Sequence, residues 1–294
     1  MQVHLTKLQL SSFFHYSSRK QFNSTSRTAK LITIFTSSKY IQMSKHKILG
    51  LIPARYGSTR FPGKPLADIG GKTMIQRVYE QTKKELDVVY VATDDERIVE
   101  AVKAFGGDVV MTSVDHQSGT DRCAEALEKV KSIEKTDFHA VLNIQGDEPF
   151  ISPEQINLVA NCFIDNTTEL ATLVKPITKS EDLFNPNKPK VVISEDNKAL
   201  YFSRSPIPFF RSEPEENWLT KHEYFNHIGL YGYRCDVLNK ITQLPIGRLE
   251  AAESLEQLRW IENGYQIKVE QTNEQAIAID TPQDLEKVLK SGLL

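Results

Sequence analysis

The sequence has few cysteines and no long apolar run, and both shortages narrow the classes of protein that it can encode. Its 294 residues include three cysteines, Cys123, Cys162 and Cys235, which lie far apart and show no C-x-x-C spacing. A disulfide framework or a zinc site built on paired cysteines is therefore not expected. No apolar run approaches the roughly 20 residues that span a bilayer. We expect a soluble, reduced protein without a membrane partner.

Two common phosphate-binding motifs are also missing. A Walker A loop needs Gly, four residues and then Gly-Lys-Ser/Thr. The pair Gly63-Lys64 fails this test because position 58 is Ser and Pro65 follows the lysine, and Gly71-Lys72-Thr73 fails because position 66 is Leu. The chain contains no G-x-G, so it also lacks the dinucleotide fingerprint G-x-G-x-x-G. These gaps disfavour a P-loop ATPase and a Rossmann dehydrogenase.

Acidic residues are absent from the first 42 positions, which hold six basic residues and are rich in Ser and Thr. Neither a helical nor a strand period runs through this segment. Two interpretations stay open: an organellar transit peptide, or residues upstream of a true start at Met43. In both cases we expect residues 1–42 to lie outside the fold and residues 43–294 to form one folded domain.

The remaining residues are acidic overall. Removing the six from the totals of 36 basic and 38 acidic residues leaves 30 and 38 in residues 43–294, a formal net charge of −8. Bulk electrostatics therefore do not favour a nucleic-acid partner. A cluster of basic residues in this acidic part of the chain therefore indicates a local binding site for an anion.

One such cluster lies in the segment Leu51–Leu66, LIPARYGSTRFPGKPL, which follows the apolar run Lys47–Ile52. We expect that run to be a buried strand, ended by Pro53 because proline lacks a backbone donor. The loop after it holds two glycines and three cations: Gly57, Gly63, Arg55, Arg60 and Lys64. Glycines let backbone N–H groups approach a ligand, and the cations suit phosphate oxygens. The loop is therefore predicted to bind phosphate.

Strand and helix patterns alternate after this loop. Strands are expected at residues 88–92, 109–111 and 140–144, and helices at 74–86, 97–105, 120–131 and 152–166. This alternation predicts an α/β fold with a doubly wound, mostly parallel sheet. Ligands of such sheets bind beyond the carboxyl ends of the strands.

The pattern changes from Leu170 onward. Short strands are expected at residues 191–194, 199–203 and 228–233, and we interpret them as an inserted β-rich layer that lines a second substrate and contributes to a dimer contact. Helices are expected again at 249–262 and 282–290, with edge strands at 267–269 and 276–279.

Eight segments in order resemble the signature stretches of 3-deoxy-manno-octulosonate (KDO) cytidylyltransferases, which are sugar nucleotidyltransferases. They are PARYGSTRFPGKPL (53–66), ATDD (92–95), DHQSGTDR (115–122), NIQGDEP (143–149), ALYFSRSPIP (199–208), HIGLYGYR (227–234), LEQLRW (255–260) and IDTPQDL (279–285). The resemblance covers the chain from about residue 46 to its end.

This resemblance implies a Rossmann-like nucleotidyltransferase fold with the β-rich layer, and a specific reaction. The anomeric hydroxyl of KDO would attack the α-phosphate of CTP in line, releasing pyrophosphate and giving CMP-KDO for lipopolysaccharide biosynthesis. It also implies a homodimer in the cytoplasm, or in an organelle if residues 1–42 are a transit peptide. Positioning and charge neutralisation should dominate such a transfer.

Two aspartates are placed to hold Mg²⁺. Asp147 and Asp280 each follow an apolar run, and magnesium sites use one or two carboxylates with phosphate oxygens and water. From the sequence pattern alone, Asp147 could instead be a turn residue, and Asp280 could be a charge beside a helix N-terminus that Thr281 caps. The resemblance implies that both bind the metal and that Arg55, Lys64, Asp147 and Asp280 are the catalytic residues.

The resemblance also divides the remaining candidates between the two substrates. For the nucleotide it implies Pro53, Ala54, Arg55, Arg60, Lys64, Thr93, Ser118, Gly119 and Thr120. For the sugar acid it implies Gln145, Arg204, His227, Tyr231, Glu256 and Gln257. Without the resemblance, His227 would be a structural histidine, Tyr231 a core residue and the last two helix surface.

Several alternative functions stay open at this point. A CMP-sialate or CMP-8-amino-KDO synthetase would use the same chemistry, although the first usually lacks the arrangement STRFPGKP. A nucleotide-sugar glycosyltransferase usually carries a D-x-D metal motif, a spacing that Asp94-Asp95 and Asp147-Glu148 do not show. A non-catalytic nucleotide-binding protein would be favoured by loss of a loop cation or a metal carboxylate, and all are present.

Overall fold

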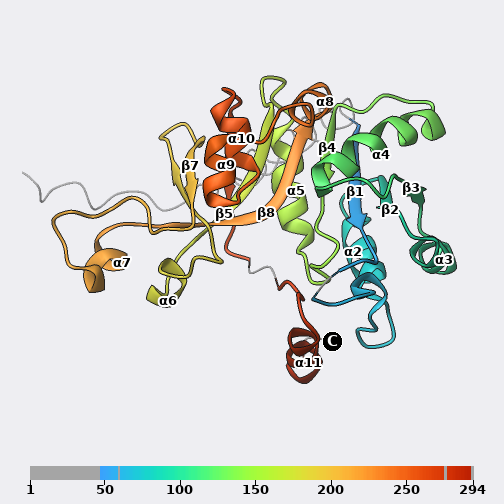
Figure 1. The fold of residues 1–294 in the computed structure, drawn as a ribbon, viewed down its shortest axis with the longest axis horizontal. Coiled ribbons are helices and arrows are strands. Elements are labelled where there is room, and N and C mark those ends of the chain that lie inside the picture. The colour runs from blue at the N-terminus through green and yellow to red at the C-terminus, as the bar shows by residue number, and fades with distance from the viewer. Residues whose placement is uncertain (1–46, 59, 275–276, 293–294) are drawn as a thin grey trace, which may run out of the picture. The chain divides into compact units, whose positions relative to one another are not determined.

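The computed structural model describes residues 47–58, 60–274 and 277–292 (Figure 1). The predictions made for residues 1–42 concern a part of the chain outside these described residues. Among the described residues, no helix has both the length and the apolar character needed to cross a membrane.

A single sheet of nine strands organises the described part of the chain, in the order β3-β2-β1-β4-β8-β5-β9 with β6 and β7 off this path. Its strands are β1 (Ile48–Ala54), β2 (Val88–Thr93), β3 (Val109–Met111), β4 (Ala140–Asn143), β5 (Leu170–Pro176), β6 (Lys190–Ile193), β7 (Ala199–Ser203), β8 (Phe225–Arg234) and β9 (Ile267–Gln271). Pairs β1–β2, β1–β4, β2–β3 and β5–β9 are parallel. Strand β8 runs antiparallel between β4 and β5.

Helices connect and cover the strands. They are α2 (Met74–Thr82), α3 (Glu96–Ala104), α4 (Gly119–Glu134), α5 (Pro153–Cys162), α6 (Ser180–Leu183), α7 (Trp218–Lys221), α8 (Cys235–Ile241), α9 (Arg248–Glu253), α10 (Gln257–Glu262) and α11 (Pro282–Lys290), with 3-10 turns η1 (Lys64–Leu66) and η2 (Glu215–Asn217). The capping box predicted at Ser152 and Gln155 is confirmed. The Gln155 side-chain oxygen accepts from the Ser152 N–H at 3.3 Å, and the Ser152 hydroxyl accepts from the Glu154 N–H of the first turn at 3.2 Å.

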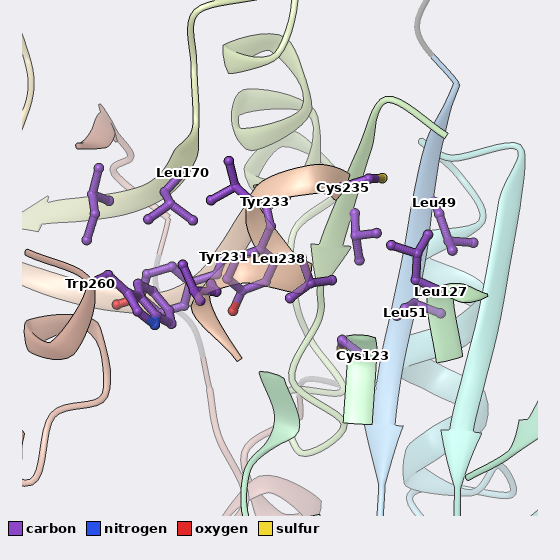
Figure 2. Close-up of a cluster of buried hydrophobic side chains, with 14 of the residues drawn as sticks. Leu49, Leu51, Cys123, Leu127, Leu170, Tyr231, Tyr233, Cys235, Leu238 and Trp260 are labelled. Atoms are coloured by element: carbon purple, nitrogen blue, oxygen red, sulfur yellow. The ribbon is translucent and has the colours of Figure 1, made fainter. Parts of the chain in front are cut away.

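Two apolar clusters fill the two faces of the sheet. One holds Leu49 and Leu51 of β1 with residues of α4, α8 and α10, and the other holds Ile52 of β1 with residues of α2, α3 and α5. Figure 2 shows Cys123 and Leu127 of α4 beside Leu49 and Leu51. Because successive side chains of a strand point to opposite faces, the apolar strand β1 contributes side chains to both clusters. The predicted doubly wound α/β fold with a mostly parallel central sheet is confirmed.

Strand β1 continues through Pro53, so the prediction that this proline ends the strand is wrong. Pro53 pairs with Ala92 and Ala54 with Thr93 of β2. The Leu51 carbonyl accepts from the Ile144 N–H, 2.9 Å away, on the β4 side. Residues of a parallel strand bond alternately to the two neighbours, so Pro53 also faces that side. Pairing with β4 has already ended at Leu51, and no ladder donor is missed.

The β-rich section predicted from Leu170 is present, and it is continuous with the main sheet. Strands β5 and β8 lie within the sheet path, and β8 is long enough to pair with β4, β5 and β6. The antiparallel pair β6–β7 extends from it. In Figure 1, β7, α6 and α7 lie at the opposite end of the described residues from β3 and α3.

The long helix predicted over residues 249–262 is two helices, α9 and α10. Ser254 between them adopts a left-handed conformation with φ of 51°, which ends an α-helix. The edge strand predicted at 276–279 is also wrong over 277–279, which are neither helix nor strand, while Ala276 lies outside the described residues. Helix α11 has the predicted bounds and packs through Val288 against Ile69 and Met74.

Candidate active site

A cavity of about 310 Å³ lies where β1 and β4 end and α4 begins. The predicted residues that line it are Pro53, Ala54, Arg55, Arg60, Lys64, Ser118, Gly119, Gln145, Asp147 and Asp280. Residues that were not predicted also line it: Ser58, Pro65, His116, Gln117, Arg122 and Gly146. The location agrees with the rule that open α/β sheets bind ligands beyond the carboxyl ends of their strands.

The basic loop is held in a closed turn. The Tyr56 carbonyl accepts from the N–H groups of Ser58 and Gly63, at 2.9 and 3.0 Å. Gly63 has a φ of 71°, a conformation that favours glycine, and a Cβ there would lie 3.1 Å from the Tyr56 ring. The Arg97 guanidinium stacks on the outer part of this turn, 3.3 Å from the centre of the Tyr56 ring. The turn thereby begins η1 at Lys64, whose side chain enters the cavity.

Lys64 joins the two predicted metal ligands. Its ammonium lies 2.7 Å from an Asp147 oxygen and 3.2 Å from an Asp280 oxygen, and only 13% of the side chain is exposed. Arg60 adds a contact of 3.3 Å to Asp280. The chain brings the aspartates together because the Ile279 N–H donates to the Asp147 carbonyl at 3.0 Å. Asp147 and Asp280, which lie 83 and 216 positions after Lys64 in the sequence, therefore both contact its ammonium group.

A glycine sets the path of the strand-end loop that carries Asp147. A Cβ on Gly146 would lie 2.9 Å from the Pro53 carbonyl oxygen, closer than real Cβ atoms approach backbone. Gly146 therefore lets the loop after β4 pass against the end of β1. This close approach puts Asp147 beside the basic loop.

A third carboxylate, Glu148, lies next to this pair and was given no role from the sequence. It is 8% exposed. Burial raises its pKa to about 7, and the negative charges of Asp147 and Asp280 add to the effect. The only signal in the sequence was its position beside Asp147.

The two aspartates suit a magnesium ion in chemistry and in placement. Both contact one ammonium, so both can reach a shared cation. Among residues 47–58, 60–274 and 277–292, no group of three or more His, Cys, Asp or Glu side chains could hold a metal. A two-carboxylate site needs phosphate oxygens and water to complete it, as magnesium sites on nucleotides do.

Two of the residues predicted for the nucleotide lie behind the cavity lining. Thr93 is fully buried, and its carbonyl accepts from the Thr112 N–H at 2.8 Å. Thr120 donates its hydroxyl hydrogen to Glu256 at 2.7 Å. Ser118, which does line the cavity, accepts from the Asp121 N–H at 3.1 Å and caps α4. Ser118 and Gly119 thus present the first turn of that helix to the cavity.

Arg122 adds a buried cation that the sequence analysis missed. The side chain is 5% exposed, and its guanidinium lies 2.7 Å from the Asp94 carboxylate. It also donates to the Thr112 hydroxyl at 2.6 Å. The ion pair neutralises most of its charge, so it shapes the cavity wall more than it adds positive potential.

Of the residues predicted for the sugar acid, Gln145 alone lines this cavity. Tyr231 lies in the apolar cluster shown in Figure 2, and Gln257 is the first residue of α10; both are buried. The Tyr231 hydroxyl and the Gln257 side-chain nitrogen have no hydrogen-bond partner among the described residues. Such atoms are costly to bury alone and mark a place for water or a polar ligand. 

Glu256 and His227 border the same cluster. Burial raises the pKa of Glu256, and hydrogen bonds from Thr120 and Ser118 oppose the effect. Burial lowers the pKa of His227 to about 3. Its Nε2 lies 3.1 Å from the Thr172 hydroxyl, and its ring packs edge-on against Phe202. At neutral pH the His227 imidazole is therefore uncharged.

Arg204 is engaged elsewhere, and the structure does not bring it to the cavity. Its guanidinium donates to the carbonyls of Glu253 at 2.6 Å, Pro186 at 2.9 Å and Ser254 at 3.1 Å. These contacts satisfy carbonyls at the end of α9 and hold the break before α10. The sequence pattern alone could not reveal them, because they cross between 18 and 50 positions of chain.

Comparison with known families supports a nucleotide-transferring site. A family model described as cytidylyltransferase matches residues 49–270. A Parabacteroides distasonis protein named 3-deoxy-manno-octulosonate cytidylyltransferase is 60% identical over 247 residues, which are 83% of this chain and 97% of that protein. A Bacteroides thetaiotaomicron protein of the same name is 63% identical over 242 residues, covering 81% and 95%.

Solved structures agree with these relatives. A CMP:2-keto-3-deoxy-manno-octonic acid synthetase complexed with CTP is 44% identical, with a TM-score of 0.75 over 83% of this chain and 97% of that one. A 4-diphosphocytidyl-2C-methyl-D-erythritol synthase from Anaerococcus prevotii is 14% identical, with a TM-score of 0.56 over 85% and 97%. The second likeness concerns the fold alone.

Proposed function

The chain belongs to the cytidylyltransferase family, and we infer that it transfers CMP from CTP to KDO with release of pyrophosphate. The observation that carries this inference is a relative named 3-deoxy-manno-octulosonate cytidylyltransferase, which is 60% identical over nearly its whole length. The geometry supports it, because the cavity at the strand ends gathers Arg55, Arg60 and Lys64 beside two carboxylates. Such a site suits a triphosphate with its metal ion.

We propose that the cations of the basic loop bind the phosphates of CTP. Arg55 and Arg60 can donate in pairs to phosphate oxygens, and Lys64 acts as a point charge. Backbone N–H groups of the loop and of the first turn of α4 would complete the nucleotide site, with Ser118 and Gly119 near the base. Thr93 and Thr120 then act from behind the cavity lining.

We propose Asp147 and Asp280 as the residues that hold Mg²⁺. When bound, the ion would neutralise charge on the phosphate oxygens during transfer. The Lys64 ammonium now contacts both carboxylates, so binding of CTP with magnesium would move Lys64 from carboxylate to phosphate. The side chain needs only a change of partner within the cavity, since it is already placed among anions.

KDO would lie between Gln145 and the buried groups of the neighbouring cluster. The Gln145 side-chain nitrogen donates to the Gly229 carbonyl at 3.2 Å, which fixes the side chain at the cavity wall. The unpaired Tyr231 hydroxyl and Gln257 nitrogen suit the hydroxyl groups of a sugar. Glu256 and His227 complete this group, and Arg204 would act by holding α9 in place.

The reaction is a single in-line displacement. The anomeric hydroxyl oxygen of KDO forms a bond to the α-phosphorus, the bond to the pyrophosphate oxygen breaks, and the hydroxyl proton is released. Positioning of two anions supplies most of the rate enhancement in such transfers, since the protein makes no covalent bond. The buried thiol of Cys123 takes no part, and burial raises its pKa far above neutrality.

We further propose the wider setting that the resemblance implies. CMP-KDO would serve lipopolysaccharide biosynthesis in the cytoplasm, residues 1–42 would lie outside the catalytic domain, and the protein would be a homodimer. Exposed apolar side chains at Leu200 and Phe209, 55% and 73% exposed, support a partner surface at the end that carries β6 and β7.

One assay tests the proposed function. Pyrophosphate release is measured with CTP and KDO, and again with sialic acid or 8-amino-KDO as acceptor. Release with KDO and CTP, and much less with sialic acid, is the expected result. Release of a nucleoside diphosphate from a nucleotide sugar would instead indicate a glycosyltransferase, and binding without turnover would indicate a non-catalytic protein.

A further inference from the structure

His116 lines the cavity, and none of the roles assigned above uses it. It lies in the loop between β3 and α4, two residues before Ser118. Its Nε2 atom forms a hydrogen bond with a carboxylate oxygen of Glu125, on the second turn of α4. The two side chains are 20% and 26% exposed, so the pair is partly withdrawn from solvent.

The Glu125 carboxylate is held from three sides. It accepts from the Ser113 N–H at 2.9 Å and from the Lys129 ammonium at 2.7 Å, besides its contact with His116. Burial alone would raise its pKa, but these hydrogen bonds outweigh burial and lower the pKa to about 2. At neutral pH Glu125 is therefore an ionised group that accepts hydrogen bonds and donates none.

This contact decides the tautomer of the neutral His116 ring. A carboxylate can only accept, so Nε2 must carry the hydrogen, and Nδ1 is left with a lone pair. Nδ1 has no hydrogen bond among the residues that the structure describes. In its neutral form the ring thus offers a fixed acceptor, next to the Ser118 and Gly119 part of the cavity wall.

A fixed acceptor distinguishes the two pyrimidine bases of ribonucleotides. Cytosine carries an amino group, a donor, at the position where uracil carries a carbonyl oxygen, an acceptor. An acceptor in the wall bonds the first and repels the second. A site built to pair one polar group discriminates strongly against an analogue that leaves it unpaired.

We propose that His116 selects cytosine by accepting a hydrogen bond from its 4-amino group at Nδ1, and that Glu125 is the positioning residue that fixes the ring. This inference rests on the proposed function, because it concerns the base of CTP. A purely structural His116–Glu125 pair would instead fasten the loop to α4. Its loss would weaken CTP and UTP use alike.

The test compares the two nucleotides in matched variants of the full chain. The ratio of kcat/KM for CTP to that for UTP is measured by pyrophosphate release with KDO, and affinities for both nucleotides by calorimetry. We expect His116→Ala to lower the ratio at least about 10-fold, the scale of one unpaired hydrogen bond. Glu125→Ala should lower it in the same direction by a smaller factor, because the freed ring keeps its acceptor part of the time.

Lys129→Ala is the matched control. It removes another partner of Glu125 on the outer side of α4, and the ratio should stay at the wild-type value. An unchanged ratio in His116→Ala, by turnover or by calorimetry, overturns the proposal. An unchanged ratio in Glu125→Ala alone overturns the part given to Glu125. Failure of the unmodified chain to release pyrophosphate from CTP and KDO would contradict the proposed function instead.

Discussion

The Lys64 ammonium lies 2.7 Å from the Asp147 carboxylate, although one residue is proposed to bind phosphate and the other a metal ion. Each residue therefore occupies the place of the other's proposed ligand. The Lys64 ammonium neutralises Asp147 as a metal ion would, and the Asp147 carboxylate neutralises Lys64 as a phosphate would. Because the Lys64 side chain is only 13% exposed, either residue left alone would be a poorly solvated charge. The pair explains how a site for two anions stays folded without them.

Lys64→Ala should weaken CTP binding by about 1.5–3 kcal/mol, the range for a hydrogen bond to a charged group. The loss follows because the ammonium would otherwise contact the phosphates directly. Isothermal calorimetry with CTP and magnesium measures it. Binding within about 0.5 kcal/mol of wild type, the usual size of a neutral surface substitution, would contradict the role given to Lys64.

Arg204→Ala should leave CTP affinity nearly unchanged and lower the stability of the chain. Its guanidinium holds three carbonyls around the end of α9, so we expect a loss of about 1–3 kcal/mol in the free energy of unfolding. The KM for KDO should rise with the displacement of α9 and α10. Denaturant unfolding and calorimetry are the measurements. Loss of CTP binding as severe as in Lys64→Ala would show that the two substrates do not divide the site as proposed.

Gly146→Ala should lower turnover at least about 10-fold, because the new methyl group would lie 2.9 Å from the Pro53 carbonyl and displace Asp147. Gly50→Ala is the matched control, since a Cβ at Gly50 would also lie 2.9 Å from its nearest neighbour, the Leu86 side chain, but away from the cavity lining. Pyrophosphate release in both variants makes the comparison. Equal activities would mean that the approach of the two strand ends does not set the position of Asp147.

His227 should make the protein sensitive to acid. Its pKa is about 3 in the folded chain, below the ordinary value of 6.5, so the folded state binds fewer protons than the unfolded state between these values. Stability from this group is fully present above pH 6.5 and falls as the pH drops toward 3, by up to about 1.4 kcal/mol per pH unit.

His227→Gln should therefore flatten the fall in the free energy of unfolding between pH 6 and pH 4, although it lowers stability at neutral pH. The exposed His222 provides the control variant, His222→Gln, which should keep the wild-type slope. Urea unfolding at several pH values gives both slopes. A slope in His227→Gln as steep as that of the wild type would rule out His227 as the source.

A chain starting at Met43 should melt and turn over like the full chain. The first 42 residues carry no acidic residue and no period that would build a core, so removing them should cost the domain nothing. Thermal melting and pyrophosphate release compare the two proteins. Loss of solubility or activity on truncation would show that the segment is part of the domain.

Local patterns predicted much of the fold. Apolar runs of four to seven residues became β1, β2 and β4, and the sequence Ser-Pro-Glu-Gln at Ser152 predicted the start of α5, because both signals depend on neighbouring residues alone. The break at Ser254 was missed because the helical period continues across it. Its left-handed turn is stabilised by Arg204, which is distant in sequence.

Some residues of the candidate site could likewise be identified from the sequence, and others could not. Asp147 could be found from its place after an apolar strand, and Arg55 and Lys64 from their glycine-containing loop. His116 and Arg122 could not, because only the packing of the loop after β3 and of the first turn of α4 against the ends of β1 and β4 brings them to the cavity. Arg204 was assigned through resemblance, and its actual partners are backbone carbonyls that no sequence pattern shows.

The most direct test of the account is pyrophosphate release from CTP and KDO by the wild type, Asp147→Asn and Asp280→Asn, with magnesium present. The amides keep the shape of the side chains but remove the charge that would hold the metal. We expect turnover to fall at least about 100-fold in each variant, the scale for losing a main electrostatic stabiliser, with melting temperatures that still indicate a folded protein. Near-normal turnover in both folded variants would contradict the central claim that these two carboxylates form the catalytic metal site.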